Sequence, residues 1–441
     1  MGNNFKFGGG GETYIHFVVG LALAVVGIFI LCLPRRHVVA PVLVAIFLVP
    51  MDQVIVVGGL HFTVLRLVIL LFWVRVLATK FYLGCEFFNG GINRLDKTVI
   101  LYVGTSVIAF TLLWQESAAF INHLGLFYNI CGSYFAFRFF IRDKEDVERT
   151  IRVLGCIVIP IAVIMTIEVL TGWNAYALIG GGAKALRESI MLRGERFRAF
   201  ASFGHPILAG TFGATLFPLF LGLLLKGGAN IGMTLAAAIA ASVIVLSSNS
   251  STPLLAYLAG IGALCLWPLR DYMSPIRRGI AIALILLHLT MQAPVWALIQ
   301  RVDLIAGSSG FHRYYLIDSA IRHFGEWWLL GAKDNSAWGF EMWDLANQYI
   351  AIGWDSGLFP LVLFVALIVF GFKYLGRARK ACEGNRGQEL FLWALGAALF
   401  SHVIAFFGAS YFDQTIVGWY MFLALISAVA VSTEASGAQA E

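Results

Sequence analysis

Residues 202–225 read SFGHPILAGTFGATLFPLFLGLLL, an apolar run that contains no Asp, Glu, Lys or Arg. A helix needs about 20 such residues to cross the ~30 Å hydrocarbon core of a bilayer, so the run predicts a membrane-spanning helix. Strict alternation is absent, which disfavours a β-barrel, and an isolated backbone satisfies its own hydrogen bonds in lipid only as a helix. Comparable runs lie near 14–33, 37–57, 61–79, 98–114, 119–140, 153–171, 230–247, 252–269, 279–298, 348–372, 390–408 and 413–432. The predicted fold class is therefore all-α, a polytopic transmembrane helical bundle with about 12–13 spans.

The composition excludes a soluble globular protein. The 441 residues are 59% hydrophobic and 13% charged, whereas soluble domains carry about 25% charged residues. The six cysteines are scattered without a CxxC pair or a metal-binding spacing, so neither a metal site nor a cofactor is predicted from them. The net charge of +6 does not indicate a nucleic-acid partner, because membrane proteins concentrate Lys and Arg in their cytoplasmic loops.

The connectors between the runs alternate in charge. One set holds most of the 31 Lys and Arg residues, and short basic loops mark the cytoplasmic side. The other side then carries two long polar segments, 172–201 and 299–347, the second with enough helical spacing to form short surface helices. The chain accordingly divides into N-terminal spans (1–171), a first outer loop (172–201), central spans (202–298), a large outer loop (299–347) and C-terminal spans (348–441).

One basic residue, Arg66, lies inside an apolar run. A charge at that depth usually faces the bundle interior and pairs with another group. We expect its partner to be Asp52 or Glu168.

The first outer loop ends in a cluster of cationic side chains before a span. Arg196, Arg198 and His205 precede or flank Pro206, and proline suits the first turn of a helix. The N-terminus of such a helix attracts anions, and arginine forks bind phosphate oxygens. This predicts a phosphate-binding site at the outer surface, with a solvated loop or contacts to lipid headgroups as the alternative.

The second outer loop is dense in charged and aromatic side chains. Residues 310–324 have helical spacing and predict a helix on the membrane surface. Its tryptophans either stack on sugar rings or anchor the membrane interface. The hydroxyl-rich turn 247–253 could touch a sugar or be a simple turn. The loop's candidate substrate-binding residues are His312, Arg322, Lys333, Trp338 and Trp343.

Three stretches resemble one family. RAFASFGHPILAG (198–210), HRYYLIDSAI (312–321) and NQYIAIGWDSGLFPLVLF (347–364) look like the motifs of the O-antigen ligase and O-antigen polymerase superfamily of bacterial membrane glycosyltransferases. The resemblance covers roughly 196–363. It implies transfer of sugar units from an undecaprenyl-diphosphate-linked saccharide to a glycan or lipid acceptor. The reaction would need no metal or cofactor and would take place on the periplasmic side of the inner membrane, with polysaccharide assembly proteins as partners.

The resemblance also implies roles for single residues. Arg198 and Arg313 would neutralise the diphosphate, an electrostatic role that cations can fill. The family's histidine, thought to activate the acceptor hydroxyl, corresponds to Ala346, and the following Asn347 is retained. A general base must then come from elsewhere. We expect Asp344 to be this base or, alternatively, the N-cap of the next helix; Glu341, His312 and His323 are further candidates.

Two other functions fit the same composition. A transporter or flippase of a lipid-linked saccharide would place its polar site near the membrane midplane, often in repeated halves. Here the polar density lies in outer loops and no repeat is evident, which favours the transferase. A non-catalytic assembly partner in polysaccharide export is the third reading, because the family's histidine is missing.

Overall fold

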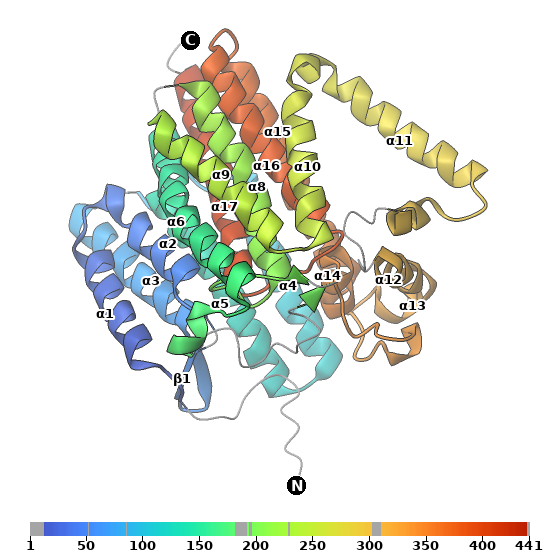
Figure 1. The fold of residues 1–441 in the computed structure, drawn as a ribbon, viewed down its shortest axis with the longest axis horizontal. Helices are drawn as coiled ribbons and strands as arrows, with labels where there is room; N and C mark the ends of the chain where they lie inside the picture. Colours follow the sequence, from blue (N-terminus) through green and yellow to red (C-terminus); the bar gives the residue numbers. More distant parts are fainter. Residues whose placement is uncertain are drawn as a thin grey trace.

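The computed structural model describes residues 13–51, 53–84, 86–180, 192–193, 196–227, 230–301 and 310–438. Within them the chain is an all-α bundle with two short hairpins (Figure 1), which confirms the predicted fold class. The N-terminal helices are α1 (Phe17–Cys32), α2 (Val39–Leu48), α3 (Val64–Leu83), α4 (Arg94–Trp114), α5 (Ser117–Phe140) and α6 (Lys144–Thr171). The central ones are α8 (Pro206–Lys226), α9 (Ile231–Ser247), α10 (Ser251–Cys265) and α11 (Met273–Thr290). The rest are α12 (Gly310–Arg322), α13 (Phe324–Trp327), α14 (Gln348–Ser356), α15 (Leu358–Ala381), α16 (Arg386–Ala405) and α17 (Gln414–Ala438).

Short elements fill the connectors. The hairpins pair β1 (Val54–Val57) with β2 (Leu60–Thr63) and β3 (Leu192–Arg193) with β4 (Arg196–Phe197), both antiparallel. The 3-10 turns are η1 (Arg35–His37), η2 (Ala175–Ile179), η3 (Trp267–Tyr272), η4 (Val295–Arg301) and η5 (Ser336–Trp338). Both hairpins lie in connectors rather than among the packed helices.

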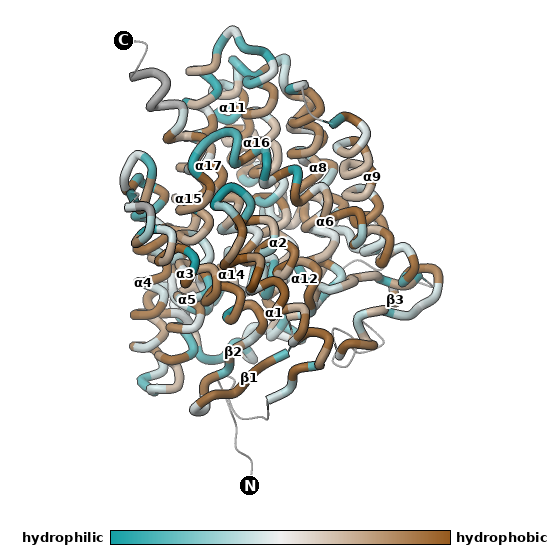
Figure 2. Tube along the Cα trace, turned by 90° about the vertical axis from the view of Figure 1, so that its left-hand side faces the viewer, coloured by the Kyte–Doolittle hydropathy of each residue, from teal (hydrophilic) through white to brown (hydrophobic). Residues whose placement is uncertain are grey.

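Seven segments of the described chain are helices long and apolar enough to cross a membrane. They comprise α4, α6, α8, η3 with α11, α15, α16 and the first part of α17, and α1, α9 and α10 are shorter apolar helices. Figure 2 shows the apolar residues along the helices and the hydrophilic ones gathered in the connectors. The chain is thus a multi-pass helical membrane protein by the length and composition of its helices.

Two predicted spans differ from the observed elements. The run 37–57 forms only the 10-residue α2, about 15 Å long at 1.5 Å per residue, followed by the β1–β2 hairpin. The turn Gly58–Gly59 takes left-handed backbone angles that glycine favours (φ +59° and +79°). The run 348–372 is broken between α14 and α15 at Gly357, where φ is +86° and an added Cβ would lie 2.5 Å from the carbonyl oxygen of Leu329.

Helix α8 runs through the middle of the bundle. It packs against α9, α10 and α16, and Figure 1 shows it surrounded by them. Close approach depends on small residues: a Cβ at Gly213 would meet the carbonyl oxygen of Ala241 at 2.6 Å. The tight packing of α8 therefore fixes the position of His205 and Pro206, at the start of this helix, at one end of the bundle.

The basic connectors lie together at one end. Arg35 pairs with Asp146 across 3.1 Å, and Arg379 pairs with Asp271 across 3.2 Å. Lys226 forms an ion pair with Glu148. These contacts join the start of α6 to the connector after α1 and to the end of α8, and they join the end of α15 to the segment after α10.

The polar segments lie at the opposite end, where the described part of the first outer loop is tied to neighbouring elements. Gln53 Nε2 donates to the carbonyl of Ile179 (2.6 Å), and Gln414 Nε2 donates to that of Ser202 (2.9 Å). Figure 1 shows α12, α13 and α14 at this lower end, away from the C-terminus.

Of the two predicted partners of Arg66, Glu168 is not the one observed. Its Nη1 donates to the carbonyl of His61 at 2.6 Å, a backbone group left accessible at the end of the β1–β2 hairpin. Glu168 instead binds the loop that follows Arg198, as described below, and Asp52 lies outside the described residues.

Candidate functional site

Arg198 is buried at the outer end of the bundle. Its side chain is 4% exposed, and Nη2 donates to the hydroxyl of Ser250 at 2.8 Å. The backbone N–H of the next residue, Ala199, donates to the carbonyl of Ser247 at 3.0 Å. The first outer loop is therefore fastened, side chain and backbone, to the turn between α9 and α10.

Glu168 fixes the loop from the other side. Its Oε2 accepts from the backbone N–H groups of Phe200 (3.1 Å) and Ala201 (2.9 Å), and its Oε1 accepts from Asn174 Nδ2 (3.0 Å). Three donors from two segments therefore meet at one buried carboxyl group. Glu168, at the end of α6, thus sets the path of the chain directly after Arg198.

His205 is the N-cap of α8. Its Nδ1 accepts from the backbone N–H of Ile207 at 3.1 Å, and Pro206 occupies the first helical position as expected. Because Nδ1 accepts, the neutral ring carries its hydrogen on Nε2. The predicted helix N-terminus is present, and His205 itself satisfies one of its free N–H groups.

Arg313 approaches the same turn from the second outer loop. It lies on α12, 7% exposed, and its Nε is 3.1 Å from the position that a Cβ on Gly408 would occupy. The carbonyl of Gly408 accepts from the hydroxyl of Thr252 at 3.0 Å. Thr252 comes two residues after Ser250, the partner of Arg198. The structure therefore brings both arginines close to residues 248–252, the turn after α9 together with the first residues of α10, from segments far apart in sequence.

Asp344 lies within electrostatic reach of Arg313. The residue is exposed, yet surrounding protein atoms remove part of the water from its carboxyl group, and this raises the pKa of Asp344 above its ordinary value. Nearby charges act in both directions: His312 and Arg313 lower the pKa, and Glu341 raises it. A carboxylate with a raised pKa is a stronger base than an ordinary aspartate.

His312 is held by the backbone of the same residue. Its Nε2 is 3.0 Å from the carbonyl oxygen of Asp344, and a carbonyl only accepts, so Nε2 carries the hydrogen. The ring of His312 is therefore held at the backbone of Asp344, whose carboxyl group lies within electrostatic reach of Arg313.

Asn347 caps α14. Its Oδ1 accepts from the backbone N–H groups of Tyr349 (3.0 Å) and Ile350 (3.1 Å), and its Nδ2 donates to the carbonyl of Phe407 (3.3 Å). The alternative that Asp344 is the N-cap is therefore wrong, because the cap lies three residues later. Asn347 is buried and ties α14 to the chain beside Gly408.

Trp338 belongs to the small core of the second loop. It is 2% exposed, packs with Leu316 and Trp327, and its Nε1 donates to Glu326 at 3.0 Å. A buried indole cannot stack on a sugar, so the structure contradicts that role for Trp338. His323, a candidate base, stacks against Trp338 with 5.9 Å between ring centroids and bonds to Glu326.

The contacts described for the other predicted binding residues are with groups other than Arg198 and Arg313. Arg322 is mostly exposed and pairs with Asp318 across 2.6 Å. The ammonium of Lys333 lies 5.4 Å from the centre of the Trp114 ring. Trp343 is 74% exposed, which suits either of its predicted roles. Arg196 is exposed on β4.

Sequence reasoning missed the groups that join the two arginines. Ser250 and Thr252 lie in the turn that was singled out only for its hydroxyls, whereas Gly408 and the loop-binding role of Glu168 carried no sequence signal. No protein-family model matches the chain, and no curated protein matches it significantly in sequence.

Proposed function

We propose that the protein is a glycosyltransferase of the bacterial cytoplasmic membrane. It would transfer sugar units from an undecaprenyl-diphosphate-linked donor to a glycan or lipid acceptor on the periplasmic side. The observation that supports this most is the approach of Arg198 and Arg313 to residues 248–252. Two buried guanidinium groups near one segment offer several N–H donors to the oxygens of a diphosphate headgroup.

The chemistry assigns a task to each group. The acceptor oxygen attacks the anomeric carbon of the donor sugar, and the bond between that carbon and the diphosphate oxygen breaks. Negative charge then grows on the diphosphate, where Arg198 and Arg313 stabilise it; such preorganised charge is usually the largest catalytic contribution. The acceptor hydroxyl gives its proton to Asp344, which lies in electrostatic reach of Arg313.

The position of the candidate residues favours transfer over transport. Arg198 and Asp344 lie in connectors between the helices, whereas a transporter places its polar site near the midplane of the membrane.

The test compares lysine substitutions of three buried arginines. Lysine keeps the charge but loses the bidentate geometry that arginine offers to phosphate. We expect R198K and R313K each to lower transfer in reconstituted vesicles by at least about tenfold, the effect of roughly one lost charge-assisted hydrogen bond. The matched control is R379K: Arg379 is also buried, but it pairs with Asp271 and Glu389 at the basic end.

A deletion strain separates transfer from transport. Undecaprenyl-linked units that accumulate in the outer leaflet support transfer, and accumulation confined to the inner leaflet would contradict it. Full transfer by both lysine variants at normal expression would also contradict the proposal.

A further inference from the structure

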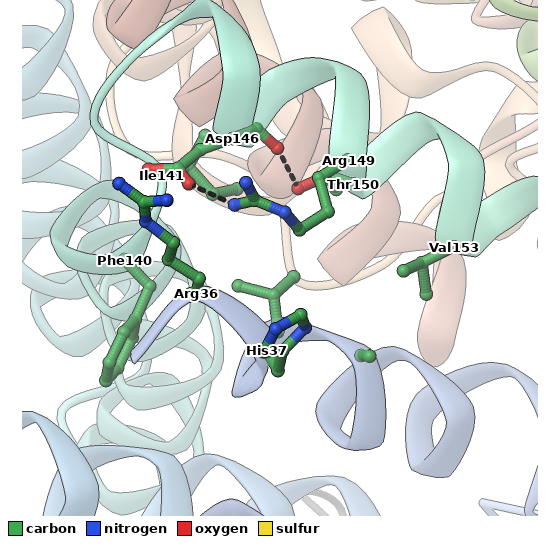
Figure 3. Close-up of a pocket in the computed structure, with 10 residues that line it drawn as sticks. Arg36, His37, Phe140, Ile141, Asp146, Arg149, Thr150 and Val153 are labelled. Atoms are coloured by element: carbon green, nitrogen blue, oxygen red, sulfur yellow. Dashed lines mark hydrogen bonds and ion pairs between the residues drawn. The ribbon is translucent and has the colours of Figure 1, made fainter. Parts of the chain in front are cut away.

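A cavity of about 40 Å³ opens at the basic end of the bundle, opposite the site above. It lies between η1 with the start of α2 on one side and the α5–α6 junction on the other (Figure 3). By the same measure of volume, one water needs roughly 10–15 Å³. The cavity therefore has room for about three groups the size of a water molecule, such as the outer oxygens of a phosphate.

The charge at this cavity is positive. Asp146 accepts from Arg35 (3.1 Å) and from Arg149 (2.6 Å), so one carboxylate is shared by two guanidinium groups. Among the Lys, Arg, Asp and Glu residues that line the cavity, Arg36 and Arg149 against Asp146 leave one positive charge, and Arg35 adds another at its edge through Asp146. Figure 3 shows Arg149 directed at Asp146, while Arg36 and His37 come from the opposite segment.

Arg36 is available to a ligand. It is exposed, and within the part of the chain that the structure describes it forms no ion pair, unlike Arg35 and Arg149. A cation at the edge of a cavity that has no ion-pair partner of its own is expected to attract an anion from solution or from the membrane.

The backbone adds to the same attraction. Val39 and Ala40, the first residues of α2, line the cavity. No side chain of its N-cap, Val38, bonds to the first turn. The positive end of the helix dipole therefore points at the cavity.

The remaining wall is apolar. Phe140, Ile141 and Val153 line it, and α6, which carries Val153, is long and apolar enough to cross the membrane. A ligand that matches both halves carries a phosphate beside an apolar body. We propose that this cavity binds the phosphate headgroup of an anionic phospholipid from the adjoining leaflet, since basic pockets between spans are typical sites for such headgroups.

The experiment titrates phosphatidylglycerol onto the full-length protein and counts bound lipid by native mass spectrometry. For R36Q we expect about tenfold weaker binding of one lipid molecule, the loss of roughly one charge-assisted contact, and for R36K a smaller loss. The control is R377Q, which removes an exposed arginine from the same end on α15 and is expected to leave binding unchanged. Because Arg36 has no ion pair to lose, thermal unfolding without lipid should match the wild type.

Three results would overturn the proposal. Equal weakening in R36Q and R377Q would mean general attraction to a basic surface. Competition by inorganic phosphate at the concentration of the lipid would identify a site for soluble anions. Unchanged lipid binding in both R36Q and R149Q would show that the lipid does not bind in this cavity. None of these outcomes depends on the glycosyltransferase proposal.

Discussion

Gly408 offers the sharpest test of how the site is packed. A Cβ built on this residue would collide with the hydroxyl of Thr252 and lie 3.1 Å from Nε of Arg313. The substitution G408A must therefore displace at least one of them. The Thr252 hydroxyl also bonds to the carbonyl of Gly408, so its displacement loses that contact as well.

The expected cost follows from these contacts. Overpacking a well-packed site costs about 1–3 kcal/mol, and one lost neutral hydrogen bond costs about 1 kcal/mol. The variant should remain folded, with a lowered free energy of unfolding. Transfer should suffer far more, because misplacing a group by about 1 Å can reduce a rate about 10²-fold. We therefore expect roughly hundredfold slower transfer in vesicles at nearly normal expression.

The matched control is G396A on α16. A Cβ on Gly396 meets no atom within 4 Å, and alanine is favoured over glycine inside a helix by about 1 kcal/mol. This variant should be at least as stable as the wild type and fully active. Transfer by G408A within about twofold of G396A would refute the inference that Thr252, Gly408 and Arg313 form one site.

Further predictions concern the base and the aromatic residues. D344N should lower transfer by about 10²–10⁴-fold, the usual contribution of a general base, and normal activity would exclude Asp344 from that role. Since a base must be ionised and the pKa of Asp344 is raised by loss of water, transfer should fall on acidification at a higher pH than an ordinary aspartate would give; a pH–rate profile flat through that range would contradict this. W338A should lower the free energy of unfolding by about 3–5 kcal/mol, because the indole is buried. W343A should leave stability within about 0.5 kcal/mol, and equal melting temperatures of the two variants would show that the loop core is misassigned.

The parts of the fold that depend on local composition could be predicted from the sequence. The run 202–225 yields α8, and the basic connectors gather at one end, because lipid burial and loop charge act on short stretches. The β1–β2 hairpin was missed since an apolar Val- and Ile-rich run looks the same as a strand or a buried helix. The break at Gly357 depends on the approach of Leu329, a contact that no local pattern reports.

Individual candidate residues could be named from the sequence, but their connections could not. Arg198 stood out as part of a cationic cluster before a span, and Arg313 stood out through the family resemblance. Ser250 and Gly408, which lie next to these arginines, come from other segments of the chain. Their proximity is set by the tertiary structure and leaves no local sequence pattern. The same reason explains the misassigned tryptophan, since the burial of Trp338 is created by the folding of α12 and α13 against it. It also explains the cap, because Asp344 and Asn347 are both favoured cap residues and only the backbone decides between them.

A cryo-EM structure of the protein with undecaprenyl diphosphate bound would test the proposed site directly. We expect the diphosphate beside residues 248–252, with guanidinium nitrogens of both Arg198 and Arg313 within about 3 Å of its oxygens. A diphosphate bound elsewhere, or held by only one of the two arginines, would contradict it.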